Sequence, residues 1–416
     1  MSELPVRPDD LRALGALFAP GIAADPYPAY ARWRAERPVA RPRERLYVLS
    51  RFADCEAVLA DPAFGRATDG DGRPVRGLGP ARREDGLAAR SMLALNPPDH
   101  TRLRRLVSRA FTPARVRELA PRVEALTAEL LASVANRAGP GPDGRFDLIA
   151  GLALPLPVAV ISELLGIPPA DRPRLVAWSD ALARSLDPPF LVSEEERGRQ
   201  RAARDEFAAY LRGLLPSRRH SRGGDLISAL IDVHDAGGRL TEDELVGLCM
   251  LLLIAGHETT RSLIGAAVLA LLRHPAELAV LAARPSLVGQ AVEEALRYDP
   301  PVQMISRFAL RSTEIADVAV AAGSFTLMLL GAANRDEALC ADAERFSVTR
   351  DGQRNLSFGQ GIHFCLGAPL ARLEAATALR QLLPRLPRLR IAGEPQWRPN
   401  IVLRGLEHLW LEEAQP

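Results

Sequence analysis

The most informative stretch of the chain is Phe358-Gly359-Gln360-Gly361-Ile362-His363-Phe364-Cys365-Leu366-Gly367. Two glycines precede the cysteine and one follows it, so the backbone can bend closely against a flat surface. Helical spacing resumes from Pro369 to Leu383, which places Cys365 just before the amino terminus of a helix. The dipole of that helix favours an anion at this end, and therefore favours a thiolate.

Several roles are open to a cysteine in this position. A lone cysteine is most often a small, buried apolar residue. Zinc would need two more ligands beside His363 and Cys365, and a nucleophile would need a base and an oxyanion site; neither signature lies nearby in the sequence. Ligation of a haem iron explains the glycines and the following helix together, and a thiolate ligand favours O–O cleavage.

The pattern Phe-Gly-x-Gly-x-His-x-Cys-x-Gly resembles the haem-binding signature of the cytochromes P450 and matches it at every fixed position. The resemblance runs from Asp25 to Leu406 and is strongest to the soluble bacterial branch that acts on secondary metabolites such as polyketides and macrolides. It implies a mainly α fold with small β-sheets and a long central helix over a buried haem. It also makes Cys365 the proximal ligand of the iron of haem b, with Phe358 and His363 beside the haem.

Composition and charge fit one soluble globular chain. The 416 residues include 53 basic and 51 acidic side chains. This balance lacks the excess of positive charge that is typical of nucleic-acid-binding proteins. The four cysteines have no paired spacing, which is typical of a reduced, cytoplasmic setting. The amino terminus resembles neither a signal peptide nor an anchor, and the most apolar run, 245–256, is shorter than the ~18 residues of a membrane span. We expect a cytoplasmic monomer with one domain over 1–416, including a small β-rich region from parts of 25–65 and 300–330.

Helical patterns dominate the chain. The clearest one begins at Thr241, where Thr241-Glu242-Asp243-Glu244 forms a capping box, and it runs to about Arg273. At 1.5 Å per residue this helix would be roughly 48 Å long. Its middle, 248–254, is apolar on every face, which predicts a central, buried helix. Shorter expected elements are helices at 102–111, 116–135 and 369–383, strands at 46–49 and 401–403, and loops at 70–80, 139–144 and 187–190.

The long helix carries a polar interruption, Ala255-Gly256-His257-Glu258-Thr259-Thr260. From the residues alone this is either a satisfied polar kink or a buried acid beside a hydroxyl that relays protons. The resemblance favours the second interpretation, because the family has this pattern on the distal face of the haem. It implies that Thr259 acts in oxygen activation, that Glu258 gates proton entry, and that the small Ala255 leaves room for oxygen and substrate.

Haem propionates need charged hydrogen-bond donors. By resemblance these donors are His100, Arg104, Arg307 and His363, of which His100 and Arg104 are four apart and so share a helical face. Arg102 and Arg105 are expected to be ordinary exposed side chains. Basic residues near Arg105 and Arg109 form a hypothetical docking site for an acidic iron–sulfur protein.

Glu294 and Arg297 are three apart, a spacing that is common in surface ion pairs. Their position between the long helix and the cysteine loop resembles the Glu-x-x-Arg pair of the family. The resemblance adds Arg345 as a third partner in a structural network that holds the cysteine loop.

The resemblance also implies a largely apolar substrate pocket, which suits a lipophilic ligand without identifying it. Its residues would be Met92, Phe190, Leu252, Val302, Met304, Ile401 and Val402.

Three functions are compatible with these features. The first is a monooxygenase that uses O2 and electrons passed from NAD(P)H by a ferredoxin reductase and a ferredoxin. The second is a peroxygenase driven by hydrogen peroxide, although such family members commonly lose the acid–alcohol pair that is present here as Glu258-Thr259. The third is a non-catalytic haem or carrier-protein binding module, which would not need the cysteine signature.

Overall fold

The computed structural model describes residues 4–19, 21–66, 91–108, 111–137, 145–220, 223–235, 240–352 and 354–414. The loops expected at 70–80 and 139–144 lie outside these residues. The chain forms two compact units, the first from residues 1–65, 121–156 and 259–416 and the second from residues 66–120 and 157–258. The expectation of a single domain over 1–416 stays a prediction.

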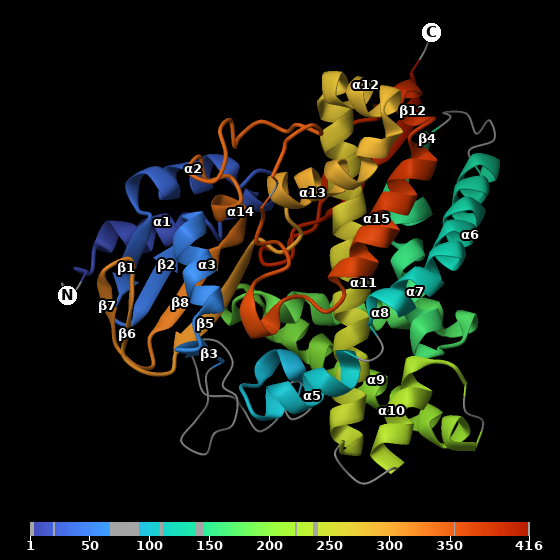
Figure 1. Ribbon diagram of the computed structural model, residues 1–416, viewed down its shortest axis with the longest axis horizontal. Helices are drawn as coiled ribbons and strands as arrows, with labels where there is room; N and C mark the ends of the chain where they lie inside the picture. The colour runs from blue at the N-terminus through green and yellow to red at the C-terminus, as the bar shows by residue number, and fades with distance from the viewer. Residues whose placement is uncertain are drawn as a thin grey trace. The chain divides into compact units, whose positions relative to one another are not determined.

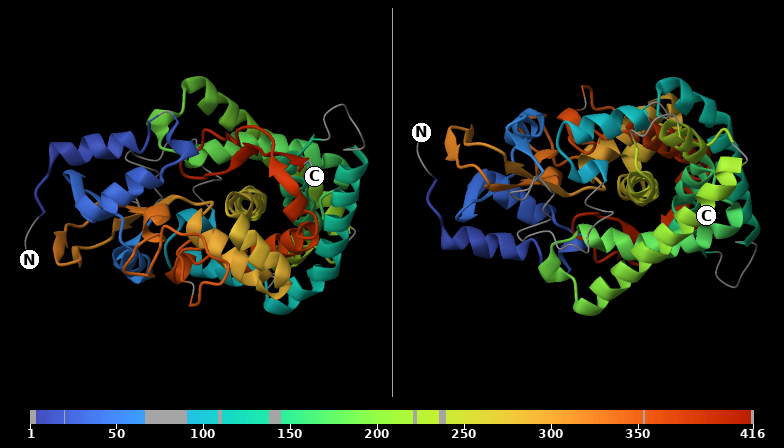
Figure 2. Two further views of the ribbon diagram at one scale, coloured as in Figure 1. Left: turned by 90° about the horizontal axis from the view of Figure 1, so that it is seen from above. Right: turned by 90° about the horizontal axis from the view of Figure 1, so that it is seen from below.

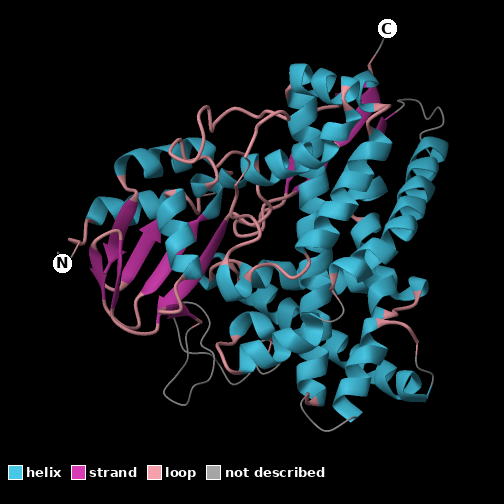
Figure 3. Cartoon of the chain, viewed as in Figure 1, coloured by secondary structure: helices cyan, strands magenta, loops and turns pink. Residues whose placement is uncertain are grey.

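The first unit contains a five-stranded sheet, drawn in magenta in Figure 3. Its strand order is β1 (Val39–Arg43), β2 (Leu46–Leu49), β8 (Phe325–Leu329), β5 (Met304–Ala309) and β3 (Phe64–Gly65). Strands β2 and β8 are parallel, and the other neighbouring pairs are antiparallel. The strand expected at 46–49 is confirmed as β2.

Both faces of this sheet are covered, which explains why all four residues of β2 are buried. Tyr47 and Leu49 pack into one hydrophobic cluster together with α3 (Phe52–Ala60). Leu46 and Val48 point the other way, into a cluster with α1 (Pro8–Ala16) and α2 (Tyr27–Glu36). Successive side chains of a strand alternate between faces, so a doubly covered strand is apolar throughout.

The rest of the described part of the first unit consists of helices and three small sheets. Its further helices are most of α6 (Pro113–Arg137), the end of α11 (Glu242–Arg273), α12 (Pro275–Ala283), α13 (Val288–Tyr298), α14 (Leu330–Ala333) and α15 (Ala368–Leu382). Three small sheets are formed by β4 (Arg145–Asp147), β12 (Trp410–Glu413) and β9 (Leu389–Ile391), by β10 (Gln396–Trp397) and β11 (Leu406–His408), and by β6 (Thr313–Ile315) and β7 (Val318–Val320).

The strand expected at 401–403 is wrong. This segment makes one isolated bridge, between Leu403 and Val302, and the nearest strand, β11, begins only at Leu406. Its partner segment begins with Pro300 and Pro301, which have no N–H to donate to a ladder. The β-branched residues that suggested a strand therefore lack a partner with which to extend one.

Helices are the only regular secondary structure among the described residues of the second unit. It contains α5 (Asp99–Ser108), most of α7 (Pro155–Leu165), α8 (Arg172–Ala183), α9 (Glu194–His220), α10 (Leu226–Asp235) and the first part of α11. Helices α8 and α9 pack through Trp178, whose ring stacks on Phe207 with 5.2 Å between centroids. The expected loop at 187–190 contains a short 3-10 turn, Pro189–Leu191. The expected fold class, mainly α with small sheets, is confirmed.

Helix α11 is 32 residues long and is labelled in Figure 1; Figure 2 shows its ribbon end-on in both views. Its predicted capping box is present, because the Glu244 N–H donates to Thr241 Oγ1 at 3.2 Å and the Thr241 N–H donates to Glu244 Oε2 at 2.8 Å. The other helices expected from the sequence are found as α5, α6 and α15, with slightly shifted ends. Within the described ranges no helix alone has the length and apolar character of a membrane span; α11 and α12 meet that test only as a pair, bent by 105°.

Candidate active site

The cysteine loop is folded back on itself just before α15. The Cys365 N–H donates to the carbonyl oxygen of Phe358 at 2.8 Å, and the Phe364 N–H donates to that of Gly361 at 3.0 Å. Cys365 is exposed, and it lies two residues before Gly367, the N-cap of α15. A Cβ added to Gly367 would lie 4.0 Å from Cys365 Sγ, so the sulfur sits close to the helix terminus that favours an anion.

Glycine is required at one point of this loop by both conformation and space. Gly361 has φ +68°, in the left-handed region, and a Cβ there would lie 2.5 Å from the carbonyl oxygen of Leu59 on α3. The loop is thus pressed directly against the backbone of α3. This close approach leaves no room for a side chain at Gly361, four residues before Cys365.

Arg372 ties the loop to the neighbouring helix. Its guanidinium lies over the ring of Phe358, 4.5 Å from the centroid, and its Nη2 donates to Glu293 Oε2 of α13 at 3.1 Å. Phe358 is half-buried between these contacts. The ring at the start of the cysteine loop is therefore held by α13 and α15 together.

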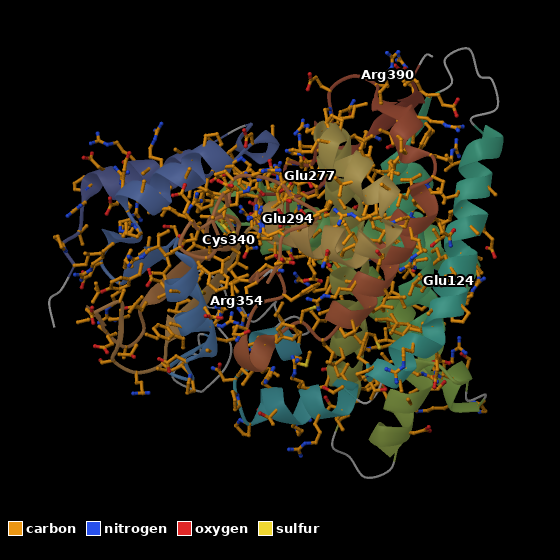
Figure 4. All side chains as sticks on the ribbon, turned by 45° about the horizontal axis from the view of Figure 1, so that its top comes forward. Glu124, Glu277, Glu294, Cys340, Arg354 and Arg390 are labelled. Atoms are coloured by element: carbon orange, nitrogen blue, oxygen red, sulfur yellow. The ribbon has the colours of Figure 1, made fainter. Side chains whose placement is uncertain are left out.

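Glu294 and Arg297 form a buried, bidentate pair rather than a surface one. Two N–H groups of Arg297 donate to the two carboxylate oxygens, each at 2.8 Å. Arg297 also donates to the carbonyl oxygens of Asn334, Ala343 and Arg345. Figure 4 labels Glu294 and, close to it, Glu277 of α12. The network holds the segment that leads from α14 towards the cysteine loop.

The third side chain of this network, beside Glu294 and Arg297, is Arg350, which corrects the assignment of Arg345. Arg350 Nε donates to Glu294 Oε1 at 3.2 Å, and its side chain is 12% exposed. Arg345 contributes only its carbonyl to Arg297, while its own side chain, 66% exposed, pairs with Glu277 at 3.3 Å. The direction of the loop decides which arginine turns inward, and no local sequence signal encodes that direction.

Arg307 on β5 is a second buried cation of the first unit. It is 4% exposed, and burial lowers its pKa to about 10. Its guanidinium donates to the carbonyl oxygen of Ser306 at 2.9 Å, and no carboxylate within the described parts of the chain pairs with it. A buried guanidinium needs an anionic partner, and a haem propionate has the right chemistry.

Strand alternation separates Arg307 from Met304. Ile305 and Ala309 share the face of Arg307 and pack with the α3 cluster, whereas Met304 belongs to the cluster with α1 and α2. Met304 is therefore a core residue, which corrects its assignment to the substrate pocket. Among the other pocket assignments of this unit, Val302, Ile401 and Val402 are partly buried against the same clusters.

In the second unit His100 and Arg104 lie one turn apart on α5, and His100 is fully buried. Arg102, expected to be a plain exposed side chain, instead pairs with Glu244 at the start of α11 and with Asp99. The pair with Glu244 ties α5 to α11. Arg105 is exposed as expected, and Arg109 lies outside the described residues. Of the pocket assignments here, Met92 and Leu252 are buried and Phe190 is exposed.

The polar segment 255–260 of α11 has one side that is accessible to solvent and one that is buried. Ala255 is exposed and Thr259, four residues on, is half-buried, whereas His257, Glu258 and Thr260 are buried. A Cβ on Gly256 would lie 3.2 Å from Ile161 of α7, so the two helices are in close contact there. His257 Nε2 lies 3.2 Å from Glu258 Oε1, a contact that the sequence analysis did not predict.

These residues define a class of protein. An exposed cysteine at a helix amino terminus, on a glycine loop pressed against α3, together with a buried arginine that pairs with no described carboxylate, fits a haem held by a thiolate. Among the described residues no group of three or more His, Cys, Asp and Glu side chains could hold a metal ion by itself. The cysteine loop and the buried arginine have the donor chemistry that a haem-thiolate protein requires.

Comparison with known proteins gives the family. Residues 80–281 and 283–391 match the family model described as Cytochrome P450. The chain is 42% identical over 409 residues to the cytochrome P450 monooxygenase PikC of Streptomyces venezuelae, covering 96% of this chain and 93% of PikC. It is 36% identical over 398 residues to the polyketide biosynthesis cytochrome P450 PksS of Bacillus subtilis, covering 92% of this chain and 95% of PksS.

A solved structure agrees with this assignment. The ligand-free crystal structure of Mycobacterium smegmatis CYP164A2 superposes with a TM-score of 0.87 at 44% identity, covering 97% of this chain and 100% of that one. The chain therefore belongs to the cytochrome P450 family. It is an oxidoreductase of the monooxygenase class, and the family implies a haem iron and O2.

Proposed function

We propose that this chain inserts one oxygen atom from O2 into a lipophilic small molecule, with Cys365 as the proximal ligand of its haem iron. The observation that carries the proposal is the cysteine loop: Cys365 is exposed, its N–H is fixed by Phe358, and its sulfur lies beside the N-cap of α15. When bound, haem b supplies the iron at which O2 is activated, and a thiolate ligand favours O–O cleavage. Propionate binding, proton delivery and the lining of the substrate pocket are proposed roles of the protein's own side chains.

Four cationic or hydrogen-bonding side chains are proposed to hold the propionates: His100 and Arg104 on α5, Arg307 on β5 and His363 in the cysteine loop. Arg307 has the strongest support, because its charge is buried without a described carboxylate. Phe358, fixed by Arg372, is proposed to pack against the haem ring.

The propionate role of Arg307 can be tested by haem loss. Arg307→Gln should release haem to an excess of apomyoglobin about 10- to 100-fold faster than the parent, because a charge-assisted bond contributes ~1.5–3 kcal/mol. Arg311→Gln is the matched control, since Arg311 follows closely in the chain and is exposed. Equal rates of haem loss for the parent and Arg307→Gln would remove Arg307 from the propionate donors.

Glu258 and Thr259 are proposed to deliver protons and to act in oxygen activation. Glu258 is buried, so its carboxyl can hold a proton away from bulk water, and Thr259 is half-buried one residue further along α11. Ala255, on the exposed side of the same helix, leaves space for O2 and substrate.

The proposed substrate is a secondary metabolite of the polyketide or macrolide kind. The name of PksS, a polyketide biosynthesis cytochrome P450, supports this class. Apolar side chains assigned to the pocket, such as Leu252 and Val302, suit a lipophilic ligand. The proposed electron donors are a ferredoxin and its reductase, which draw on NAD(P)H.

One comparison separates this function from a peroxygenase. Candidate polyketides are first screened for a shift of the haem absorbance, and a ligand that shifts it is then offered as substrate. Oxygenated product formed with ferredoxin, reductase and NAD(P)H, but not with hydrogen peroxide alone, supports the monooxygenase. Product formed equally well with peroxide alone contradicts it.

A further inference from the structure

Asn334 is a buried side chain to which the proposed function gives no task. It is the C-cap of α14. Its Oδ1 accepts a hydrogen bond from the Leu356 N–H at 2.7 Å, and its Nδ2 donates to Ser357 Oγ at 2.9 Å. Leu356 and Ser357 are the two residues that precede Phe358, where the cysteine loop begins. One buried amide therefore contacts both residues that lead into the cysteine loop.

The partners of this amide decide its orientation. The Leu356 N–H can only donate, so the atom that faces it must be the carbonyl oxygen of the amide. The Ser357 hydroxyl has one hydrogen, which it donates to the carbonyl oxygen of Leu296 at 2.6 Å. The hydroxyl oxygen then accepts from Asn334, which requires the NH2 group on that side. Each donor faces an acceptor, so the side chain is held in one orientation.

The Leu296 carbonyl needs the Ser357 hydroxyl as a donor. Leu296 lies in the last turn of α13, where carbonyl oxygens lack partners within the helix. The residue four further along is Pro300, which has no N–H to donate. The Ser357 hydroxyl supplies the missing hydrogen, and Asn334 Nδ2 lies 3.5 Å from the same oxygen. The entry to the cysteine loop is therefore hydrogen-bonded to the end of α13.

The backbone of Asn334 is fixed by the buried pair on α13. Its carbonyl oxygen accepts from Arg297 Nη1 at 3.1 Å. Arg297 is held in turn by both carboxylate oxygens of Glu294. A hydrogen bond from a charged donor is stronger than one between neutral groups, so this end of Asn334 is firmly placed. The side chain then carries that placement to the cysteine loop.

A second asparagine makes a similar bond that is local in sequence. Asn355 Oδ1 accepts from the Ser357 N–H at 3.1 Å, two residues along the chain. Its Nδ2 donates to Glu293 Oε2 at 3.4 Å, which is long for a hydrogen bond, and its side chain is half-buried. Asn355 therefore shapes the turn without a short, buried bond to another element.

The backbone between Leu356 and Cys365 transmits the placement. Phe358 follows Ser357 directly, and its carbonyl oxygen accepts the Cys365 N–H at 2.8 Å. The Leu356 carbonyl accepts the Gly359 N–H at 2.8 Å, which closes a turn over the same residues. A shift of Leu356 and Ser357 therefore shifts the carbonyl to which the Cys365 backbone is bonded.

We propose that Asn334 is a positioning residue for Cys365, which it holds in place through Ser357 and Phe358. Without the amide, the sulfur should leave its position while the surrounding helices are still folded. This inference rests on the proposed role of Cys365 as the proximal ligand and adds to it the side chain that keeps the ligand in place.

Three substitutions separate the contacts. Asn334→Ala removes both side-chain bonds to the loop. Ser357→Ala removes the bond to the Leu296 carbonyl and leaves the Asn334 bond to the backbone of residue 356 intact. Asn355→Ala is the matched control, because it removes an asparagine of the same segment whose contact with the loop is local. All variants are studied as haem-loaded, reduced, carbon monoxide-treated proteins.

The first readout compares two urea midpoints, one for loss of the red-shifted Soret band and one for loss of the helical circular dichroism. A change in overall stability alone moves both midpoints together. We expect Asn334→Ala to lose the band first, with the ratio of thiolate-ligated to unligated protein lowered about tenfold while the helices are intact, because buried hydrogen bonds are lost. Ser357→Ala should show a smaller separation, and Asn355→Ala should behave like the parent.

Ser357→Ala is the deciding variant, because it is the smaller change and removes a single link. If its two midpoints stay as far apart as those of the parent, the proposal is overturned, whether or not Asn334→Ala folds. A separation in Asn355→Ala as large as that in Ser357→Ala would overturn it too, since any bond to the segment would then be sufficient.

The parent and Cys365→His separate this inference from the proposed function. If the parent has no red-shifted band, or if Cys365→His keeps it, the proposed role of Cys365 fails. If the parent has the band, Cys365→His loses it and Ser357→Ala matches the parent, that role stands and the inference about Asn334 fails.

A second readout does not depend on the spectrum. Hydrogen exchange is compared between a peptide that spans 356–365 and one from α15, residues 368–382. In Asn334→Ala and Ser357→Ala we expect about tenfold faster exchange in the first peptide and parent-like exchange in the second. Equal acceleration of both peptides, or of neither, would overturn the proposal.

Discussion

The backbone N–H of Cys365 donates a 2.8 Å hydrogen bond to the carbonyl oxygen of Phe358, and this bond closes the cysteine loop. The sulfur is therefore positioned by backbone geometry as well as by its own side-chain rotamer. The elements that hold the loop, namely α3, α13 and α15, can each be tested by a substitution outside the ligand itself.

The contact of the loop with α3 is tested by Gly361→Ala. We expect a loss of about 2–5 kcal/mol in unfolding free energy, from ~1–2 for the left-handed φ and ~1–3 for the overlap with Leu59. Gly393→Ala is the matched control, because Gly393 also has a left-handed φ, +87°, but has nothing within 4 Å. Urea unfolding of the two variants measures the difference, and equal losses would mean that the α3 contact is relaxed at no cost.

The buried pair on α13 is tested by Arg297→Lys. Lysine keeps the charge but loses the bidentate contact and several carbonyl partners, so we expect a loss of about 3–5 kcal/mol. The chain offers the same Glu-x-x-Arg spacing in exposed form at Glu194 and Arg197 of α9. Arg197→Lys should change stability by less than ~0.5 kcal/mol. Similar urea midpoints for the two variants would contradict the structural role of the buried pair.

The identity of the third member of the network around Glu294 and Arg297 is tested by comparing Arg350→Ala with Arg345→Ala. Arg350 donates to the buried Glu294 carboxylate and to the carbonyls of Ala341, Asp342 and Arg345, so its loss removes a charged hydrogen bond from a buried acid and should destabilise by about 2–3 kcal/mol. Arg345→Ala preserves the carbonyl that Arg297 uses and should change stability by at most ~1 kcal/mol. Thermal unfolding of both variants decides the matter, and the reverse order would restore Arg345 to the network.

Glu374 on α15 gives a prediction about pH. Burial raises its pKa well above the usual value, and Thr377, one turn further on, is buried as well. Above the unfolded pKa of about 4.3 the unfolded chain ionises this group while the folded one retains its proton, so stability falls as pH rises through that window. Glu374→Gln removes this pH dependence, which amounts to up to about 1.4 kcal/mol of unfolding free energy per pH unit. The unfolding free energy of Glu374→Gln, relative to that of the parent, should therefore increase from pH 5 to pH 8. Urea unfolding at each pH measures the difference.

The exposed Glu413 provides the control for this pH series. Glu413→Gln should follow the parent at every pH. If Glu374→Gln also follows the parent, the buried carboxyl is compensated by a partner that stabilises its charged form.

The features that could be predicted from the sequence are those that depend on residues close together in the chain. The capping box at Thr241 is formed reciprocally, because both partners lie within one helical turn. The strand at 46–49 follows from a short apolar run, and the helix after Cys365 follows from helical apolar spacing. The family signature around Cys365 likewise needs only consecutive residues.

The features that were missed depend on which way a side chain turns in the folded chain. Met304 and Arg307 are three apart on one strand and so face opposite sides, which places Met304 in the core. Arg350 was missed because the loop turns it inward while it turns Arg345 towards Glu277. The contact of His257 with Glu258 joins adjacent helical residues, which helical spacing does not bring face to face.

The central claim, that Cys365 ligates a haem iron, is tested most directly by the visible spectrum of the reduced, carbon monoxide-treated protein beside a Cys365→His variant. The account predicts a strongly red-shifted Soret band in the parent and its loss in the variant. Absence of haem from the parent, or a parent band at the position of an imidazole-ligated haem, would contradict it.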